Sequence, residues 1–220
     1  PERVLKKLGI LKKSQVIPTG IDPAPYGANR AAPSPKITVS YVGRLESVKG
    51  VDDFLAAVDP LLDEFPLLTV QVVGWYKQGH SLVEQYRRVV FTGLRDDIPA
   101  ILEQTEIFVL PSYSEGLSNA LMEAMASGCA CIASDVGGNA FLIQNGVSGF
   151  LFPPGDREAL RAHLKRLLAD PPKMRAMGKA ARERIEQQFS WEHISKLYAK
   201  LFDESRIMNH ESRKDAGHDS

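Results

Sequence analysis

The feature that most constrains the fold of this chain is a regular alternation of short apolar runs with segments of helical spacing. Six runs rich in apolar and β-branched residues predict strands: ITVSYVG (37–43), LTVQVVG (68–74), VVFTG (89–93), EIFVLP (106–111), CACIAS (129–134) and GFLF (149–152). Between them, apolar residues recur at every third or fourth position, as from Val51 to Phe65, where Pro60 predicts a break. Such alternation is typical of a parallel sheet with helices on both faces. We therefore predict an α/β fold with a doubly wound parallel sheet.

The segments between and after these runs predict helices. Short helices are expected over residues 96–104, 117–127 and 137–146. Beyond residue 152 the pattern is helical, with C-terminal helices that carry apolar stripes and a last helix for which Ser190 is the predicted N-cap. From Glu204 onward the chain is polar and unpatterned, and we expect a disordered tail there.

Composition and charge exclude several classes of partner. Lys+Arg and Asp+Glu number 27 each among 220 residues, so no net field favours nucleic acid. No apolar run approaches the length of a membrane span, and the N-terminal residues lack the apolar stretch of a signal peptide. Cys129 and Cys131 stand two apart, which is poor disulfide geometry and typical of small buried side chains in a reducing compartment. We therefore expect a cytoplasmic protein.

Two basic residues follow the first predicted strand. In doubly wound sheets the ligand binds at the carboxyl ends of the strands, and the first strand leads into GRLESVKG (43–50). Gly43 allows a tight turn, and Arg44 and Lys49 lie at the junction between the strand and a helix that starts at about Gly50. A helix N-terminus with two added cations favours a diphosphate. The alternative is that both residues are solvated surface cations.

Two carboxylates follow the fourth predicted strand. Glu115 lies in the loop, and Glu123 follows eight residues later on the predicted helix. Both side chains could reach one cleft, where carboxylates accept hydrogen bonds from pairs of sugar hydroxyls. A solvent-facing Glu123 is the alternative. The turn DVGGN (135–139) is a candidate third wall of this cleft.

These motifs together resemble the C-terminal domain of GT-B retaining glycosyltransferases, the group 1 family that includes glycogen, sucrose and mannosyl synthases. The resemblance covers roughly residues 15–200, with five features in order: VIPTGID (16–22), GRLESVKG (43–50), GLRDDIPAILEQTEIFVLPSYSEG (93–116), the pair Glu115 and Glu123, and GCACIASDVGG with NGVSGFLFPPGD (128–156). It implies a Rossmann-like half of a GT-B fold. The implied organisation is an interdomain segment with the first strand region (1–35), a sugar-nucleotide-binding domain (36–203) and the tail (204–220).

The resemblance also implies a role for each candidate residue. Arg44 and Lys49 match the basic pair that holds the donor diphosphate, and Glu115 matches the glutamate that faces the donor sugar; these three are the predicted catalytic residues. Glu123 matches the glutamate that holds the ribose hydroxyls. The donor-binding set is completed by Gly43 and the turn that contacts sugar and phosphate: Gly116, Leu117 and Ser118.

The resemblance further implies hexosyl transfer from a nucleoside-diphosphate sugar with retention. Because two basic side chains and helix N–H groups stabilise the leaving diphosphate, no metal and no separate cofactor are expected. Attack by Glu115 as a covalent nucleophile is the glycosidase-like alternative. The choice among UDP, GDP and ADP stays open.

Two departures from the family pattern affect donor preference. Phe141 stands where members often carry a glutamate, and the loop VVGWYKQG (72–79) lacks the usual second glycine. In that loop, Trp75 and Tyr76 are candidates for core packing, loop packing or base stacking.

The resemblance implies a missing partner half. GT-B enzymes place their site between two domains, and about 35 residues precede the first strand, too few for a second domain. We therefore expect an N-terminal acceptor-binding domain elsewhere, and expect this chain alone to be inactive. Contact with a membrane surface through that absent domain stays open. The alternatives are a non-catalytic nucleotide-sugar-binding subunit and half of a GT-B-type sugar-nucleotide epimerase.

Overall fold

The computed structural model describes residues 17–27 and 35–202 of the chain. By its internal contacts the chain divides into a larger unit, residues 21–186, and a smaller unit made of residues 1–20 and 187–220. The expected disordered tail from residue 204 lies outside the described residues. The domain boundaries placed at residues 36 and 203 stay predictions.

The strands of the larger unit confirm the predicted sheet. The described part of the chain forms a six-stranded sheet in the order β3-β2-β1-β4-β5-β6, and every pairing is parallel. The strands are β1 (Ile37–Val42), β2 (Leu68–Val73), β3 (Val90–Gly93), β4 (Ile107–Leu110), β5 (Ala130–Ser134) and β6 (Phe150–Phe152). Along the chain, β2 and β3 are added on one side of β1. β4, β5 and β6 are then added on its other side. This reversal makes the sheet doubly wound, and its switch point lies between β1 and β4.

The helices mostly follow the predicted pattern with shorter bounds, whereas the helical turn at 47–49 and the helix at 81–85 were not predicted. They are η2 (Ser47–Lys49), α2 (Val51–Val58), α3 (Leu61–Glu64), α4 (Ser81–Gln85), α5 (Ile98–Glu103), α6 (Asn119–Ala126), α7 (Asn139–Leu142), α8 (Arg157–Leu168) and α9 (Pro171–Gln188). The predicted break at Pro60 is confirmed, because it separates α2 from α3. The helix predicted over 117–127 begins later, at Asn119, because the Ser118 hydroxyl caps it by accepting a hydrogen bond from the Leu121 N–H.

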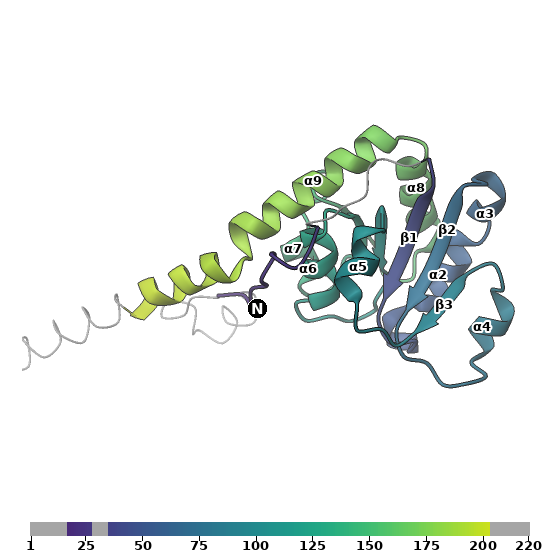
Figure 1. Cartoon of the computed structure of the whole chain (residues 1–220), viewed down its shortest axis with the longest axis horizontal. Helices are drawn as coiled ribbons and strands as arrows, with labels where there is room; N and C mark the ends of the chain where they lie inside the picture. Colours follow the sequence, from purple (N-terminus) through teal and green to yellow (C-terminus); the bar gives the residue numbers. More distant parts are fainter. Residues whose placement is uncertain (1–16, 28–34, 203–220) are drawn as a thin grey trace, which may run out of the picture. The chain divides into compact units, whose positions relative to one another are not determined.

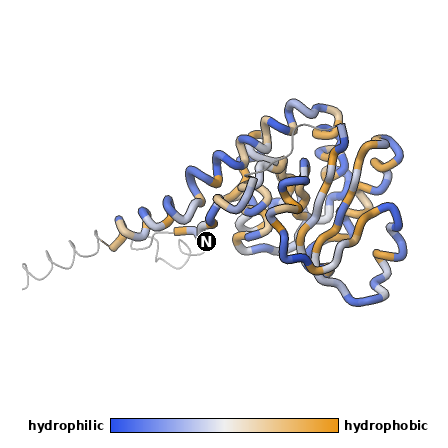
Figure 2. The backbone as a smooth tube through the Cα atoms, viewed as in Figure 1, coloured by the Kyte–Doolittle hydropathy of each residue, from blue (hydrophilic) through white to orange (hydrophobic). Residues whose placement is uncertain are grey.

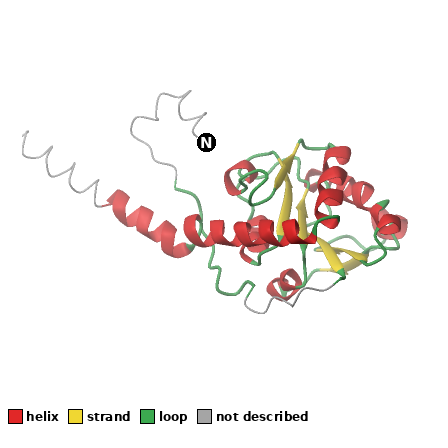
Figure 3. Cartoon of the chain, turned by 90° about the horizontal axis from the view of Figure 1, so that it is seen from above, coloured by secondary structure: helices red, strands yellow, loops and turns green. Residues whose placement is uncertain are grey.

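The sheet is covered by helices on both faces. Side chains alternate across each strand, so Val39 and Tyr41 enter a core with α2 and α8, whereas Phe108 on β4 belongs to the opposite face. Figure 1 shows α5 and α6 on the other side of β1 from α2 and α8, and the strands also lie between helices in Figure 3. The layered arrangement places the polar ends of the strands, rather than their faces, at the surface.

Burial matches the hydropathy pattern. The strands are largely orange in Figure 2, and the surface turns are blue. Cys129 and Cys131 are both buried as free thiols, as predicted. Among the described residues, no helix is both long and apolar enough to cross a membrane.

The described part of the smaller unit contains the predicted last helix. Residues 191–202 are helical, and the Ser190 hydroxyl accepts a hydrogen bond from the His193 N–H at 3.3 Å, which confirms Ser190 as the N-cap. Trp191 is 65% exposed and Tyr198 is 45% exposed. Trp191 and Tyr198 therefore leave much of their surface uncovered.

A close backbone contact joins the loops after β1 and β4. Gly50 adopts the left-handed conformation at φ 65°, and a Cβ atom there would clash with the carbonyl oxygen of Pro111. Gly74, after β2, comes equally close to the carbonyl of Gly43. Glycine at these positions is therefore required twice, by backbone conformation and by space.

We expect Gly50→Ala to destabilise the fold by about 3 kcal/mol, because it adds a clash to the strain of a left-handed residue. Gly79→Ala is the matched control. Gly79 has a similar φ of 74°, and a Cβ atom there would meet no atom within 4 Å. The control should lose only about 1 kcal/mol. Urea unfolding of the two variants measures the difference, and equal losses would show that the contact with Pro111 carries no strain.

Candidate functional site

The candidate site lies at the carboxyl ends of β1 and β4. These strands pair directly, with Val39 opposite Ile107, so the loops that follow them start side by side. The Tyr113 N–H donates to the carbonyl oxygen of Val48 at 2.8 Å and joins the two loops. The loops over residues 43–50 and 111–118 therefore meet at the switch point, where an open α/β sheet binds its ligand.

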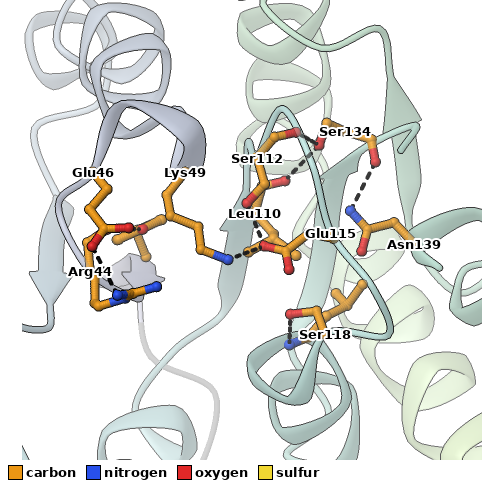
Figure 4. A network of polar contacts seen from close by, with 11 residues as sticks. Arg44, Glu46, Lys49, Leu110, Ser112, Glu115, Ser118, Ser134 and Asn139 are labelled. Atoms are coloured by element: carbon orange, nitrogen blue, oxygen red, sulfur yellow. Dashed lines mark hydrogen bonds and ion pairs between the residues drawn. The ribbon is translucent and has the colours of Figure 1, made fainter. Parts of the chain in front are cut away.

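An ion pair connects the two loops. The Lys49 Nζ lies 2.7 Å from Glu115 Oε1, and the two side chains are 24% and 10% exposed. The Ser112 hydroxyl donates to the same carboxylate oxygen, also at 2.7 Å. Figure 4 shows this arrangement. The structure thus brings together two of the three predicted catalytic residues, with the carboxylate held by two donors.

Arg44, the third predicted catalytic residue, lies at the rim. Its guanidinium pairs with Glu46 at 3.0 Å, and its side chain is 63% exposed. Its backbone is held more firmly, because the Tyr41 hydroxyl donates to the Arg44 carbonyl oxygen at 2.8 Å. Burial raises the pKa of Tyr41, which keeps that hydroxyl protonated as a donor. Because exposed ion pairs are weak, the guanidinium can exchange Glu46 for an anion of higher charge.

The predicted third wall packs against the loop that carries Glu115. The Gly138 N–H donates to the Gly116 carbonyl oxygen at 2.8 Å. Gly137 has a φ of 52°, and a Cβ atom there would clash with the carbonyl oxygen of Glu115. The turn after β5 therefore supports the backbone of Glu115 and Gly116 directly, whereas its role as a wall of a ligand cleft stays a prediction.

A buried chain of hydrogen bonds behind this wall was not predicted. The Ser134 hydroxyl, at the end of β5, donates to the Ser112 carbonyl oxygen. The Asn139 side-chain amide donates to the Ser134 carbonyl oxygen at 3.0 Å. All three side chains are buried, and Figure 4 shows the chain leading to Glu115. Small polar residues at strand ends are common, so the sequence carried no signal for this link.

The turn that leads into α6 leaves space for a ligand. Gly116 is exposed, and a Cβ atom there would have no neighbour within 4 Å. Leu117 is half-buried, and the buried Ser118 hydroxyl caps the helix. An open backbone ahead of a capped helix N-terminus can accept an anion or a polar group.

Glu123 lies apart from this network, in the middle of α6. It is half-buried, and burial raises the pKa of its carboxyl group. Its hydrogen-bond partner is Tyr26, which lies 97 residues earlier in the chain. The solvent-facing alternative is therefore wrong for Glu123, whereas a cleft shared with Glu115 stays a prediction.

A second network that sequence reasoning missed holds the loop after β4. Asp53 on α2 is only 5% exposed. Its Oδ2 accepts from the Tyr113 hydroxyl and its Oδ1 from the Arg157 Nε, both at 2.6 Å. The bond to Asp53 raises the pKa of Tyr113. The three residues come from three separate segments, so this anchor exists only in the folded chain.

The residues at the positions that depart from the family pattern differ from one another in burial. Tyr76 is partly buried against the hydrophobic core and packs edge-on against Phe91 of β3, with ring centroids 6.1 Å apart, which supports core packing for Tyr76. Trp75 is 56% exposed, and its carbonyl oxygen accepts from the Leu45 N–H at 3.1 Å. Phe141 is 50% exposed. Core packing is therefore wrong for Trp75, whereas base stacking stays a prediction.

Comparison with known sequences points to a single family, glycosyl transferases group 1. The family described as "Glycosyl transferases group 1" matches residues 36–170. Glycogen synthase of Mycobacterium tuberculosis is 33% identical over 202 residues, covering 87% of this chain and 49% of that protein. N-acetyl-alpha-D-glucosaminyl L-malate synthase of Bacillus anthracis is 36% identical over 175 residues, covering 77% and 45%. The chain thus spans about half the length of these relatives.

Solved structures share the fold. Sucrose-phosphate synthase from Thermosynechococcus elongatus superposes with a TM-score of 0.78 at 29% identity, covering 94% of this chain and 57% of that one. HepE of Anabaena, in complex with UDP-glucose, gives a TM-score of 0.76 at 24% identity, covering 92% and 61%. In each case the similarity covers nearly all of this chain and little more than half of the larger protein.

We expect Asp53→Asn to destabilise the fold by about 1–3 kcal/mol, because the buried residue 53 would then turn an N–H donor of its own toward one of its two donors. The two carboxylate oxygens of Asp53 each accept one bond, from Tyr113 and Arg157, whereas an asparagine offers one acceptor and one NH2 group. Asp52→Asn is the control, because Asp52 is exposed and lies in the same first turn of α2. It should change stability by less than about 0.5 kcal/mol. Matching urea midpoints for the two variants would contradict the anchoring role of Asp53.

Proposed function

Because the chain belongs to the family of glycosyl transferases group 1, we propose that it is the donor-binding half of a retaining glycosyltransferase that uses a nucleoside-diphosphate sugar. The observation that carries this proposal is the ion pair at the switch point. Lys49 and Glu115 come from the loops after β1 and β4 and meet at 2.7 Å, with Arg44 at the rim. A cationic pair beside a carboxylate suits a ligand with a diphosphate at one end and hydroxyl groups at the other.

In this proposal Arg44 and Lys49 bind the diphosphate of the donor. As the glycosidic bond lengthens, negative charge grows on the leaving phosphate, and fixed cations stabilise that charge. Lys49 already lies in a partly buried position, so its charge is screened less than that of a surface lysine. When the donor binds, the ammonium group gains phosphate oxygens, while Ser112 continues to hold Glu115.

The remaining residues position the sugar and the nucleoside. Glu115 faces the donor sugar, and the open backbone from Gly116 to Ser118 contacts sugar and phosphate. Glu123 binds the ribose hydroxyls, and Gly43 allows the first loop to turn beneath the diphosphate. Apart from Glu123, which lies within α6, these groups follow the end of a strand and lead into a helix, and this position supports the assignment.

We propose transfer with retention, in which the acceptor attacks the face of the sugar that the diphosphate leaves. The ion pair with Lys49 supports a positioning role for Glu115, because a carboxylate held by two donors is a weak nucleophile. Two basic side chains can supply the charge that a metal ion would otherwise provide, so the proposed reaction requires neither metal nor separate cofactor.

The proposed acceptor site lies in a second domain. Relatives such as glycogen synthase are about twice as long as the part that this chain matches. Holding an acceptor in reach of the anomeric carbon can contribute roughly 7–11 kcal/mol to lowering a barrier. We therefore propose that this chain alone binds donor without transferring it, and that the complete enzyme works in the cytoplasm.

The basic pair is tested by replacing Arg44 and Lys49 together with alanine. The tightest-binding diphosphate among UDP, GDP and ADP is first chosen by thermal shift. The double variant should bind it more weakly by about 2–5 kcal/mol in calorimetry, because two charge-assisted contacts are lost.

Alanine at Arg175 and Lys179 on α9 removes the same net charge far from the switch point in sequence. This control should bind the nucleotide like the original chain. Unchanged affinity in the Arg44 and Lys49 variant, or an equal loss in the control, would show that no specific diphosphate site exists there.

The ribose contact is tested separately by Glu123→Gln. This change should weaken nucleotide binding by about 1–3 kcal/mol, because an amide offers one acceptor in place of a charged pair of oxygens. Binding of inorganic pyrophosphate should stay the same. If both ligands lose affinity equally in calorimetry, Glu123 supports the fold and does not contact ribose.

A further inference from the structure

Tyr26 is the residue that contacts Glu123 from outside the sheet and its helices. It lies in the segment before β1, in a turn closed by the bond from its N–H to the Pro23 carbonyl oxygen at 3.1 Å. Its hydroxyl group hydrogen-bonds to the Glu123 carboxylate on α6. Neither the predicted site nor the proposed mechanism uses this tyrosine.

The backbone of Tyr26 is anchored to the same helix as Glu123. The Arg182 Nη1 on α9 donates to the Tyr26 carbonyl oxygen at 2.7 Å and to the Ala126 carbonyl oxygen at 3.1 Å. Ala126 lies three residues beyond Glu123, about 4.5 Å along the helix axis. One guanidinium therefore ties the turn to the end of α6, and the tyrosine side chain spans the distance back to Glu123.

The next residue makes this anchor specific. Gly27 has a φ of 72°, and a Cβ atom there would clash with the Arg182 guanidinium. The turn that carries Tyr26 therefore needs glycine at position 27 to leave space for the Arg182 guanidinium. The backbone that carries Tyr26 is therefore fixed by its contact with Arg182.

Electrostatics define which partner is the donor. Burial, followed by the charge of Glu123, raises the pKa of Tyr26 to about 12, so its hydroxyl is protonated at neutral pH. Burial raises the pKa of Glu123, and the hydrogen bond from Tyr26 opposes that rise. A carboxylate has about four acceptor positions, so one bond from Tyr26 leaves room for a pair of ribose hydroxyls.

We propose that Tyr26 is a positioning residue that orients the Glu123 carboxylate toward the ribose of the bound nucleotide. This inference rests on the proposed function, in which Glu123 accepts hydrogen bonds from the ribose. Tyr26 occupies one side of the carboxylate and fixes its rotation. The other acceptor positions of the carboxylate then face the ligand. The Glu123 side chain therefore loses less conformational freedom when the nucleotide binds.

The test uses Tyr26→Phe in the full chain with three ligands. These are the tightest-binding nucleoside diphosphate, its 2′-deoxy analogue and inorganic pyrophosphate. We expect the ribonucleotide to bind about three- to tenfold more weakly, as for the loss of one hydrogen bond. Pyrophosphate should bind as before, and the preference for ribose over deoxyribose should shrink. Tyr86→Phe, at another half-buried tyrosine of the larger unit, is the control and should change none of these values.

A merely structural role would give a different result. Equal weakening of all three ligands, or unchanged or tighter ribonucleotide binding, would overturn the positioning role. In a Glu123→Gln background, Tyr26→Phe should add less than about twofold, because the tyrosine acts through the carboxylate. If Glu123→Gln alone has no effect on the ribonucleotide, the proposed ribose contact fails. If Glu123→Gln weakens binding and Tyr26→Phe does not, only the inference about Tyr26 fails.

Discussion

The close backbone contact between the loops after β1 and β4 is the constraint on which the candidate site depends. Gly50 can lie against Pro111 only because it has no side chain and adopts the left-handed conformation. The same approach brings Lys49 to 2.7 Å from Glu115. In a doubly wound sheet this contact forms at the strand pair where the winding reverses, so the fold itself creates the meeting point.

The surrounding polar network makes that meeting point rigid. Asp53 joins the loop after β4 to α2 and to the start of α8, and Ser134 joins it to β5. The buried Asp53 carboxylate contributes to this rigidity because each of its oxygens is matched by a donor. The proposed charge stabilisation depends on such rigidity, since preorganised groups need little rearrangement as charge develops. Arg44, exposed at the rim, pairs with Glu46 outside this network.

Some of the candidate site was readable from the sequence. Arg44, Lys49 and Glu115 follow strand-type runs, and parallel strands direct such residues to one edge of a sheet. Asp53, Tyr113 and Tyr26 were not found, because their roles depend on hydrogen bonds between residues 60 or more positions apart. No local periodicity signals such a bond. The start of α6 was also misplaced, because the Ser118 hydroxyl caps the helix and moves its first residue to Asn119.

The sequence by itself determined the class of the fold, the order of its elements and the strand ends that carry polar residues. Those features follow from local periodicity, from glycine and proline, and from the burial of apolar runs. The tertiary structure alone decided the partner of each carboxylate, since Glu115 pairs with Lys49 while Glu123 accepts a hydrogen bond from Tyr26. Pairing depends on distances of a few ångströms between distant segments. Such distances are set by the packing of the whole sheet and its helices. No single stretch of sequence contains that information.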